Sequence, residues 1–294
     1  MSAERDLAPG LYLVGTPIGN LEDITLRAIR VLKQVELIAC EDTRQTQKLL
    51  NHFGIEKPTV SYHQHNEASR AAELLERLAQ GARIAVVSDA GTPTICDPGF
   101  RLLSLAIERG FPVVPVPGPS AFVTALVSSG LPVEPISFRG FLPSKGGARR
   151  RELEKIRESP HTEIFYETPH RIREALEEIV ATFGPGRRVV VARELTKIHE
   201  EFLRGTAAEV LAIMKSRAEL KGEIVLLIGP AEDESHPLSV SLHDRIDQLI
   251  GKEKLDEKAA LKRVAKERGI SKSEAYREWQ AQKKQIPHRL RSAE

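Results

Sequence analysis

The carboxylate of Asp89 is the group in this chain whose type and position best suit ligand binding. Asp89 lies in the segment Ser88–Gly99 (SDAGTPTICDPG), which directly follows the apolar run Ile84–Val87. At the carboxyl end of a buried strand, a carboxylate can accept hydrogen bonds from a ribose or pair with a cationic ligand. The alternative is that Asp89 only caps a turn or a helix. At the end of the segment, Asp97–Gly99 (DPG) predicts a helix start with Asp97 as the N-cap.

Two more loops rich in glycine and proline occupy equivalent positions. Val14–Asn20 (VGTPIGN) follows the run Leu11–Val14, and Val116–Ala121 (VPGPSA) follows Val113–Val116. Glycine and proline let the backbone turn sharply and approach a ligand closely. The first loop matches neither the dinucleotide pattern G-x-G-x-x-G nor a P-loop. Because the carboxyl ends of parallel strands share one edge of a sheet, the three loops predict one cleft, with Ser120 as both helix N-cap and ligand contact.

The second half of the chain has two charged clusters beside apolar runs. They are Phe165–Arg171 (FYETPHR) and Arg193–Lys197 (RELTK). The aromatic residues of the first could stack on a base or simply pack in a core, and both clusters could be plain ion pairs. A third polar segment contains His63 and His65, but no cysteine or second histidine pair supports a metal site there, so we expect no metal.

The composition indicates a folded protein of ordinary type. The chain has 294 residues, 41% of them hydrophobic and 29% charged, and two cysteines, Cys40 and Cys96. Two cysteines do not make a disulfide framework, so we expect a reduced protein of the cytoplasm. No apolar stretch has the length of a signal peptide or a membrane span, and we therefore expect no membrane association.

The elements that must position these loops follow an alternating order. In residues 1–131 strands are expected at 11–15, 36–40, 59–62, 84–87 and 113–116, with helices between them, which predicts a parallel α/β sheet. The segment Gly130–Pro135 (GLPVEP) reads as a linker to a second α/β domain, residues 132–231. There Glu200–Arg204 lies close behind Val189–Glu194, which predicts an antiparallel pair and a mixed sheet.

The C-terminal segment, residues 238–294, is expected to be a helical tail. From residue 236 onward the chain carries about five more basic than acidic residues, as a polyanion-binding segment would. Two helices around Gly269, the second capped by Ser271 or Ser273, resemble a helix-turn-helix. Lys272 and Arg277 would then face phosphates. The alternative is a small helical bundle that only assists folding or dimerisation.

Seven motifs taken together resemble one family. They are GTPIGN, EDTR, SDAGTPTICDPG, VPGPSA, FYETPHR, RELTK and GEIVLLIGP, in unbroken order from Leu11 to Pro230. They are similar to the tetrapyrrole-methylase-like methyltransferases that use S-adenosylmethionine. Members that act on small molecules have a glycine-richer first loop and Gly-Asp-Pro at the second. Here the loops read GTPIGN and SDAGTP, so the resemblance is to the branch that methylates small-subunit ribosomal RNA.

The resemblance implies a fold, a reaction and a set of contacts. The fold is two α/β domains of the tetrapyrrole methylase type, with a parallel N-terminal sheet and a mixed C-terminal sheet, and the protein is usually a homodimer. The reaction is 2′-O-methylation of a cytidine in the decoding region of 16S rRNA, so the partner is the small ribosomal subunit. The implied S-adenosylmethionine contacts are Thr16, Pro17, Gly19, Asp89, Ala90, Gly91, Thr92, Ser120, Ala121, Tyr166, Leu195 and Ile224.

A ribose hydroxyl is a poor nucleophile, so a base near it would help the transfer. Glu167 and Lys197 are the candidates on the acceptor side. For the RNA itself, basic residues beside the presumed cleft offer phosphate contacts. The run Lys145–Arg151 (KGGARRR) would be a mobile, phosphate-gripping loop or, alternatively, a solvated loop before a charged helix. The expected RNA contacts are Arg44, Lys48, Lys145, Arg149, Arg150, Arg151, Lys272 and Arg277.

Two other functions remain open at this level. One is a small-molecule methylase of the tetrapyrrole type, which would have no need of the basic tail and basic run. The other is a non-catalytic nucleic-acid-binding protein built around the tail, which would have no need of the donor loops.

Overall fold

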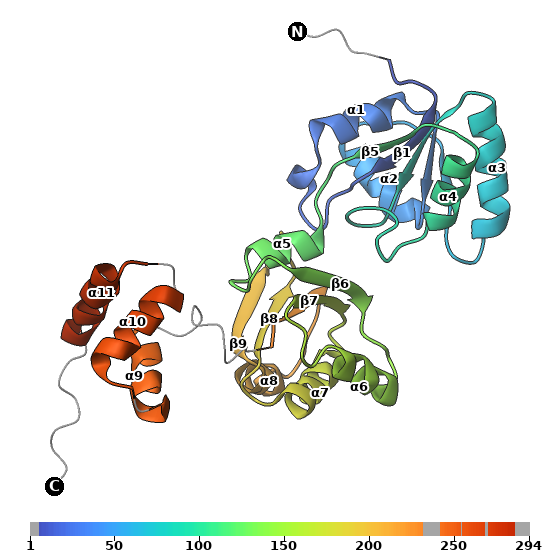
Figure 1. Cartoon of the computed structure of the whole chain (residues 1–294). Helices are drawn as coiled ribbons and strands as arrows, with labels where there is room; N and C mark the ends of the chain where they lie inside the picture. Colours follow the sequence, from blue (N-terminus) through green and yellow to red (C-terminus); the bar gives the residue numbers. More distant parts are fainter. Residues whose placement is uncertain (1–5, 232–241, 254, 268–269, 286–294) are drawn as a thin grey trace. The chain divides into compact units, whose positions relative to one another are not determined.

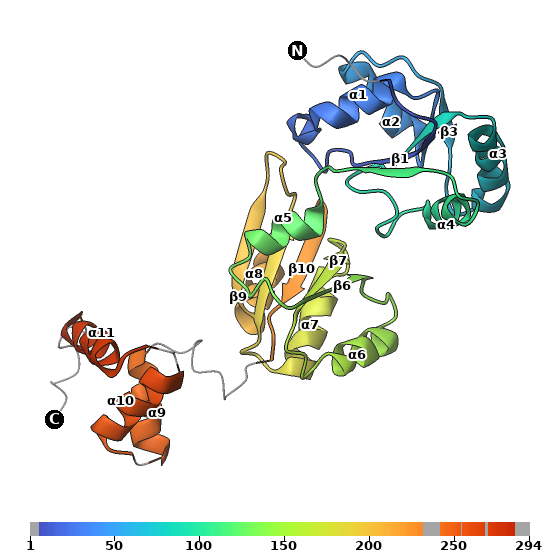
Figure 2. The same cartoon turned by 45° about the horizontal axis from the view of Figure 1, so that its top comes forward.

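The computed structural model describes residues 6–231, 242–253, 255–267 and 270–285. The chain forms two compact units, residues 1–231 and 232–294 (Figure 1). The first unit contains two five-stranded sheets with their helices, and the second contains helices (Figures 1 and 2). None of the described helices is long and apolar enough to cross a membrane.

The first sheet is parallel throughout, in the order β3-β2-β4-β1-β5. Its strands are short and apolar, and the inner ones are buried on both faces because helices cover both sides. Helices α1 and α2 pack on one face, and α3 and α4 on the other. The elements are β1 (Gly10–Val14), a short 3-10 helix (Leu21–Asp23), α1 (Leu26–Gln34), β2 (Leu37–Cys40), α2 (Thr43–His52), β3 (Thr59–Ser61), α3 (Glu67–Ala79), β4 (Arg83–Val87), α4 (Phe100–Glu108) and β5 (Val113–Val116).

The second sheet is mixed, in the order β6-β7-β10-β8-β9. β6 and β7 are parallel, and β10 is antiparallel to both β7 and β8. The predicted antiparallel pair is confirmed, because β9 pairs antiparallel with β8 from Arg188↔Thr206 to Arg193↔Glu201. The elements are α5 (Ala121–Val127), β6 (Ile136–Phe141), α6 (Gly146–Lys155), β7 (Thr162–Glu167), α7 (Ile172–Phe183), β8 (Arg188–Arg193), β9 (Glu201–Thr206), α8 (Ala207–Ser216) and β10 (Ile224–Ile228).

Helix α5 belongs by packing to the second sheet. Helices α6, α7 and α8 cover one face of that sheet, and α5 covers the other, with Ala125 and Leu126 buried against Ile164 and Val225. Ile18, from the loop after β1, is buried in the same cluster. The chain therefore passes to the second sheet before α5, whereas the sequence places α5 in residues 1–131. The division into residues 1–131 and 132–231 stays a prediction.

The second unit has three described helices, one more than the sequence indicates. They are α9 (Leu242–Glu253), α10 (Glu257–Glu267) and α11 (Lys272–Gln285). Leu249, Leu261, Val264 and Trp279 are buried in their shared core. The Ser271 hydroxyl accepts the N–H of Glu274 at 3.2 Å and so caps α11, as predicted. Gly269 lies outside the described residues.

Candidate active site

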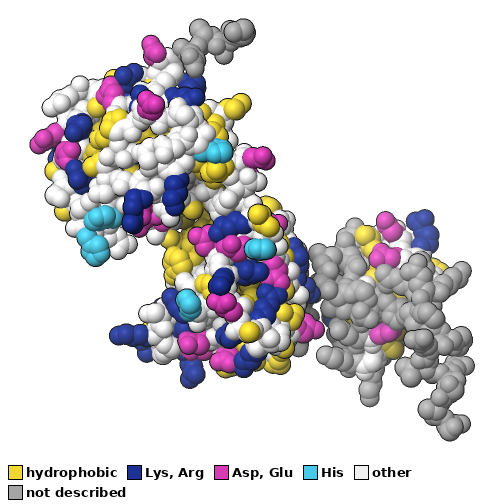
Figure 3. All heavy atoms as spheres, turned by 180° about the vertical axis from the view of Figure 1, so that it is seen from behind, with side chains coloured by type: hydrophobic (Ala, Val, Ile, Leu, Met, Phe, Trp, Pro, Cys, Tyr) yellow, Lys and Arg dark blue, Asp and Glu magenta, His cyan; other side chains and the backbone are white. Residues whose placement is uncertain are grey.

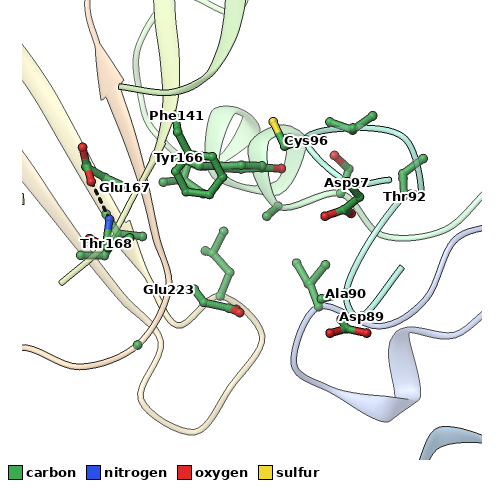
Figure 4. A pocket seen from close by; sticks show the side chains of 18 of the residues that line it. Asp89, Ala90, Thr92, Cys96, Asp97, Phe141, Tyr166, Glu167, Thr168 and Glu223 are labelled. Carbon is green, nitrogen blue, oxygen red and sulfur yellow. Dashed lines mark hydrogen bonds between the residues drawn. The ribbon is translucent and has the colours of Figure 1, made fainter. Parts of the chain in front are cut away.

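A cavity of about 360 Å³ lies at the carboxyl ends of the first-sheet strands, where the second sheet closes over them. Figure 4 shows Asp89, Thr92 and Asp97 facing Tyr166, Glu167 and Glu223 across this space. The lining residues come from three loops of the first sheet and, in the second, from β6, from β7 and the residues after it, from the loop after β8, and from β10 and the residues before it. They are Ile18, Asp89, Ala90, Thr92, Ile95, Cys96, Asp97, Ser120, Ala121, Phe141, Tyr166, Glu167, Thr168, Pro169, Leu195, Gly222, Glu223, Ile224 and Val225.

The first and second loops are joined by their backbones. The N–H of Thr16 donates to the carbonyl of Gly91 at 2.8 Å, and the N–H of Gly91 donates back to Thr16 at 3.0 Å. The Thr16 hydroxyl donates to the carbonyl of Ser88 at 3.2 Å. Gly91 has a φ of 82°, a left-handed conformation that favours glycine. Thr16 and Gly91 thus shape the rim of the cavity without lining it.

The first loop also reaches the second sheet. The N–H of Asn20 donates to the Thr196 hydroxyl at 3.1 Å. A Cβ on Gly19 would lie 2.4 Å from the Lys197 side chain, so this position requires glycine unless that side chain moves. These contacts hold the two halves of the cavity together.

The structure brings eight of the twelve expected donor contacts to the cavity wall. They are Asp89, Ala90, Thr92, Ser120, Ala121, Tyr166, Leu195 and Ile224; Thr16, Pro17, Gly19 and Gly91 do not line it. Ser120 occupies the N-cap position of α5, and its hydroxyl makes no capping hydrogen bond within the described chain. The expected contacts did not include the lining residues Ile18, Ile95, Cys96, Asp97, Phe141, Thr168, Pro169, Gly222, Glu223 and Val225. All of these except Phe141 lie within the quoted motifs, for example Ile18 in GTPIGN, Cys96 and Asp97 in SDAGTPTICDPG, and Glu223 directly before the apolar strand of GEIVLLIGP.

The cavity wall is acidic and otherwise largely apolar. Its charged side chains are Asp89, Asp97, Glu167 and Glu223, and none of the described lining residues is Lys, Arg or His. Asp89 accepts the N–H of Asp42 at 3.1 Å, which fixes its carboxylate at the rim. Such a wall fits S-adenosylmethionine, which has a cationic sulfonium and ammonium, ribose hydroxyls and an apolar, aromatic base.

Asp97 does not act as the predicted N-cap. Helix α4 begins at Phe100, and its N-cap is Gly99 with a φ of 130°. The loop bends before the helix, so the Asp97 side chain lines the cavity instead. Burial, together with the nearby negative charges of Glu41 and Asp89, raises the pKa of Asp97 to about 6.

Tyr166 presents its ring to the cavity from β7 (Figure 4). It meets Phe138 and Phe141 edge to face, with ring centroids 5.0 and 5.6 Å apart. Burial raises the pKa of Tyr166 to about 12, so the phenol is neutral at physiological pH. The aromatic residues of FYETPHR therefore serve the cavity wall as well as the core.

The two expected bases are both occupied by ion pairs. Glu167 accepts the N–H of Thr168 at 2.7 Å and pairs with Arg171 at 3.2 Å. Burial raises the pKa of Glu167, whose side chain has no exposed area. Lys197 does not line the cavity and instead bridges carboxylates of Glu194 and Glu223 at 2.8 and 3.0 Å.

The basic run Lys145–Arg151 is the start of a helix and not a mobile loop. Lys145 is the N-cap of α6, and Gly146 and Gly147 form its first turn. Arg150 and Arg151 are exposed, as the charged-helix alternative requires. Arg149 is only 3% exposed and pairs with glutamates of α7 at 3.0 and 3.3 Å. Its guanidinium holds α6 to α7 and is not available to an RNA phosphate, so the expected RNA contact at Arg149 is wrong.

The remaining basic candidates differ in their partners. Arg44 pairs with Asp42 at 2.9 Å, and this hydrogen-bonded partner lowers the pKa of Asp42 to about 2. Lys48 donates to the Gln45 side chain at 3.0 Å. Figure 3 shows basic and acidic side chains interspersed on the visible face of residues 6–231. Phosphate contacts there would be made by individual side chains.

In the second unit, α10 and α11 form a groove lined by three basic side chains, one tyrosine, one leucine, one serine and one acidic side chain, Glu257. Its lining includes Lys258, Lys272, Tyr276 and Arg277, with Leu261 at its base. The two expected tail contacts, Lys272 and Arg277, therefore lie in one groove.

Comparison with known proteins agrees with this arrangement. The family described as Tetrapyrrole (Corrin/Porphyrin) Methylases matches residues 10–211. A ribosomal RNA small subunit methyltransferase I from Halalkalibacterium halodurans is 46% identical over 278 residues, 93% of this chain and 95% of its own. The protein of that name from Escherichia coli O157:H7 is 45% identical over 268 residues, 91% and 93% of the two chains.

Among solved structures, a diphthine synthase aligns with a TM-score of 0.60 at 14% identity, over 74% of this chain and 89% of its own. At that identity the likeness shows the fold alone. The family match and the relatives at 46% and 45% identity decide the family to which the chain belongs. The chain belongs to the tetrapyrrole methylases and, within them, to the family of ribosomal RNA small subunit methyltransferase I.

Proposed function

We propose that this protein transfers the methyl group of S-adenosylmethionine to the ribose 2′-oxygen of a cytidine in the decoding region of 16S rRNA. The observation that carries the proposal is the acidic cavity between the two sheets, in a chain whose close relatives are named as methyltransferases of small-subunit rRNA. The exposed basic residues of α2, α6 and the tail favour an RNA acceptor over a small tetrapyrrole. We also propose that the protein acts in the cytoplasm, on the small ribosomal subunit.

The chain's own residues hold and orient the reactants. Asp89, fixed by the Asp42 N–H, accepts hydrogen bonds from the donor's hydroxyl groups. Ile18, Leu195 and Val225 exclude water from the donor, and Tyr166 provides an aromatic wall. Bound S-adenosylmethionine supplies an activated methyl group on a sulfonium that becomes neutral on transfer. Much of the acceleration then comes from holding the acceptor oxygen in line with the methyl group.

The RNA is held outside the cavity. Lys145, Arg150 and Arg151 of α6 and Arg44 and Lys48 of α2 are the proposed phosphate contacts on the first unit, and Lys272 and Arg277 on the second. These contacts position the RNA and do not read its sequence.

We propose a homodimer as the working form. Members of the family that the motifs resemble are usually homodimers, and the apolar side chains of Leu26 in α1 and Ile198 in the loop after β8 are 86% and 98% exposed. A second copy that covers these two side chains would remove apolar surface from water. Light scattering on the purified protein, compared with a Leu26→Lys/Ile198→Lys variant, tests this: a wild-type monomer would refute it.

The function is tested by incubating the protein with tritiated S-adenosylmethionine and 30S subunits that lack ribose methylation, and then mapping the labelled nucleotide. Label on a ribose 2′-oxygen of a decoding-region cytidine is the expected result. If the protein binds the donor but labels neither subunits nor free 16S rRNA, the acceptor is not this RNA, and a small-molecule acceptor becomes the better hypothesis.

A further inference from the structure

One of the four carboxylates on the cavity wall differs from the others in its surroundings. Three already have partners: an arginine for Glu167 at 3.2 Å, a lysine for Glu223 at 3.0 Å and a backbone N–H for Asp89 at 3.1 Å. Asp97 has no ion pair among the described residues, and the charged groups that act on it, Glu41 and Asp89, are both acidic. The hydroxyl of nearby Ser88 donates to the carbonyls of Ala90 and Gly91 at 3.2 and 3.4 Å. Asp97 is therefore the wall carboxylate whose charge is least compensated.

The backbone on both sides of Asp97 has residues with positive φ values. Thr94 and Cys96 have φ values of 75° and 64°, and Gly99 has 130°. Left-handed conformations at non-glycine residues cost free energy and persist where surrounding contacts impose them. One such contact is with β6, where a Cβ on Gly140 would lie 3.1 Å from the Cys96 sulfur. The second domain thus supports the loop that presents Asp97.

The groups that face Asp97 come from four parts of the fold. They are Glu41 after β2, Ser88 and Asp89 after β4, Cys96 beside it, and Tyr166 of β7. Figure 4 shows the hydroxyl end of Tyr166 directed toward Cys96 and Asp97. Tyr166 is a neutral phenol, and burial raises the pKa of the Cys96 thiol. The carboxylates that raise the pKa of Asp97 are those of Glu41 and Asp89.

These neighbours give Asp97 the properties of a proton acceptor near neutrality. Burial and the two carboxylates raise its pKa to about 6, so it is ionised at pH 7 yet binds a proton far more readily than an ordinary aspartate. A general base is most effective when its pKa lies near the working pH. Glu167, by contrast, is held by its arginine, and Lys197 by its two glutamates.

We infer that Asp97 is the general base of the methyl transfer and accepts the proton of the acceptor's ribose 2′-hydroxyl; this inference rests on the proposed function. In the step, the 2′-oxygen forms a bond to the methyl carbon as the carbon–sulfur bond breaks and its electron pair goes to sulfur. The 2′-O–H bond breaks and its proton passes to an Asp97 carboxylate oxygen, then to water. The products are a 2′-O-methyl ribose, a neutral thioether and a protonated carboxyl that solvent deprotonates.

Two variants of the full-length protein test the inference. Asp97→Asn keeps the shape of the side chain and removes the base. Glu41→Gln removes one negative charge that faces Asp97 and is not part of the cavity wall. For each, calorimetry gives the dissociation constant of S-adenosylmethionine, and single-turnover transfer to 30S subunits at saturating donor gives the rate from pH 5 to 9.

The expected result separates chemistry from binding. Asp97→Asn binds the donor within about threefold of wild type, while its transfer rate falls about 100-fold or more. The wild-type transfer rate falls as the pH drops through about 6, and this fall is the acid limb of its pH profile. The residual transfer rate of Asp97→Asn shows no such fall. Glu41→Gln keeps activity, and its acid limb moves to lower pH because a like charge no longer raises the pKa of Asp97.

Three results would overturn the inference: an Asp97→Asn rate within tenfold of wild type with its acid limb intact, a loss explained wholly by weaker donor binding, or an unmoved limb in Glu41→Gln. Failure of the proposed function is different, because the wild-type protein itself would then bind the donor and transfer no label to subunits.

Discussion

Gly15 and Gly118 pack backbone against backbone where the first and third loops cross. A Cβ on Gly15 would lie 2.8 Å from the Gly118 Cα, and a Cβ on Gly118 would lie 2.8 Å from the Gly15 Cα. Real Cβ atoms do not approach backbone atoms so closely, and neither loop has a flexible side chain there to move aside. With the Thr16–Gly91 bridge, this contact holds all three loops at one edge of the first sheet.

A side chain at this crossing should therefore disturb both stability and donor binding. Gly118→Ala is expected to lower the free energy of unfolding by about 1–3 kcal/mol, as overpacking of a rigid site does. It should also weaken donor binding, since Ser120 and Ala121 follow in the same loop. Denaturant unfolding and calorimetry measure the two effects. Gly147→Ala is the control, because a Cβ there meets no atom within 4 Å and the residue lies in α6.

Asp89→Ala should weaken donor binding directly. Loss of a charged hydrogen-bond acceptor costs about 1.5–3 kcal/mol, which corresponds to a dissociation constant raised about 10- to 100-fold. The substitution also removes the acceptor of the Asp42 N–H, so Asp89→Asn, which keeps an oxygen, should lose less. Glu108→Gln, an exposed change on α4, is the control. Unchanged donor affinity in Asp89→Ala would remove this carboxylate from the proposed donor site.

The sequence predicted the sheets well because buried parallel strands are apolar runs bounded by glycine and proline. The sequence-based prediction failed where the same residue pattern is compatible with two different structures. Asp97–Gly99 matches a helix start, yet Gly99 takes the cap position and Asp97 turns into the cavity. Arg149 lies in a basic run, but it stands four residues before the buried Leu153 and so shares its face of α6. That spacing was visible in the sequence; the carboxylates that pair with Arg149 from α7 were not.

Ionised Asp97 should make the folded protein less stable at neutral pH. Its pKa rises from 3.8 to about 6 on folding, so the folded protein binds the proton more tightly than the unfolded chain. Stability therefore falls as pH rises from about 4 to about 6 and stays lower above that range. Asp97→Asn removes the ionisation and should be more stable than wild type at pH 8, by up to about 3 kcal/mol.

Chemical denaturation at pH 8 and at pH 4 measures this difference. The advantage of Asp97→Asn should shrink toward zero at pH 4, where the wild-type carboxyl is protonated in the folded protein. A variant less stable than wild type at both pH values would mean that Asp97 is a structural residue whose native contacts outweigh the cost of its charge.

The groove between α10 and α11 should bind RNA through its basic side chains. Lys272→Glu/Arg277→Glu reverses two charges that line the groove, whereas Lys262→Glu/Lys266→Glu makes the same charge change on exposed positions outside it. If the groove contacts two phosphates, the first variant lowers affinity for a 16S rRNA fragment and makes the log–log salt slope less steep by about 1.4. Donor binding should not change in either variant. Equal losses in both would mean that only net charge matters, and no loss in either would leave the tail as a folding or dimerisation element.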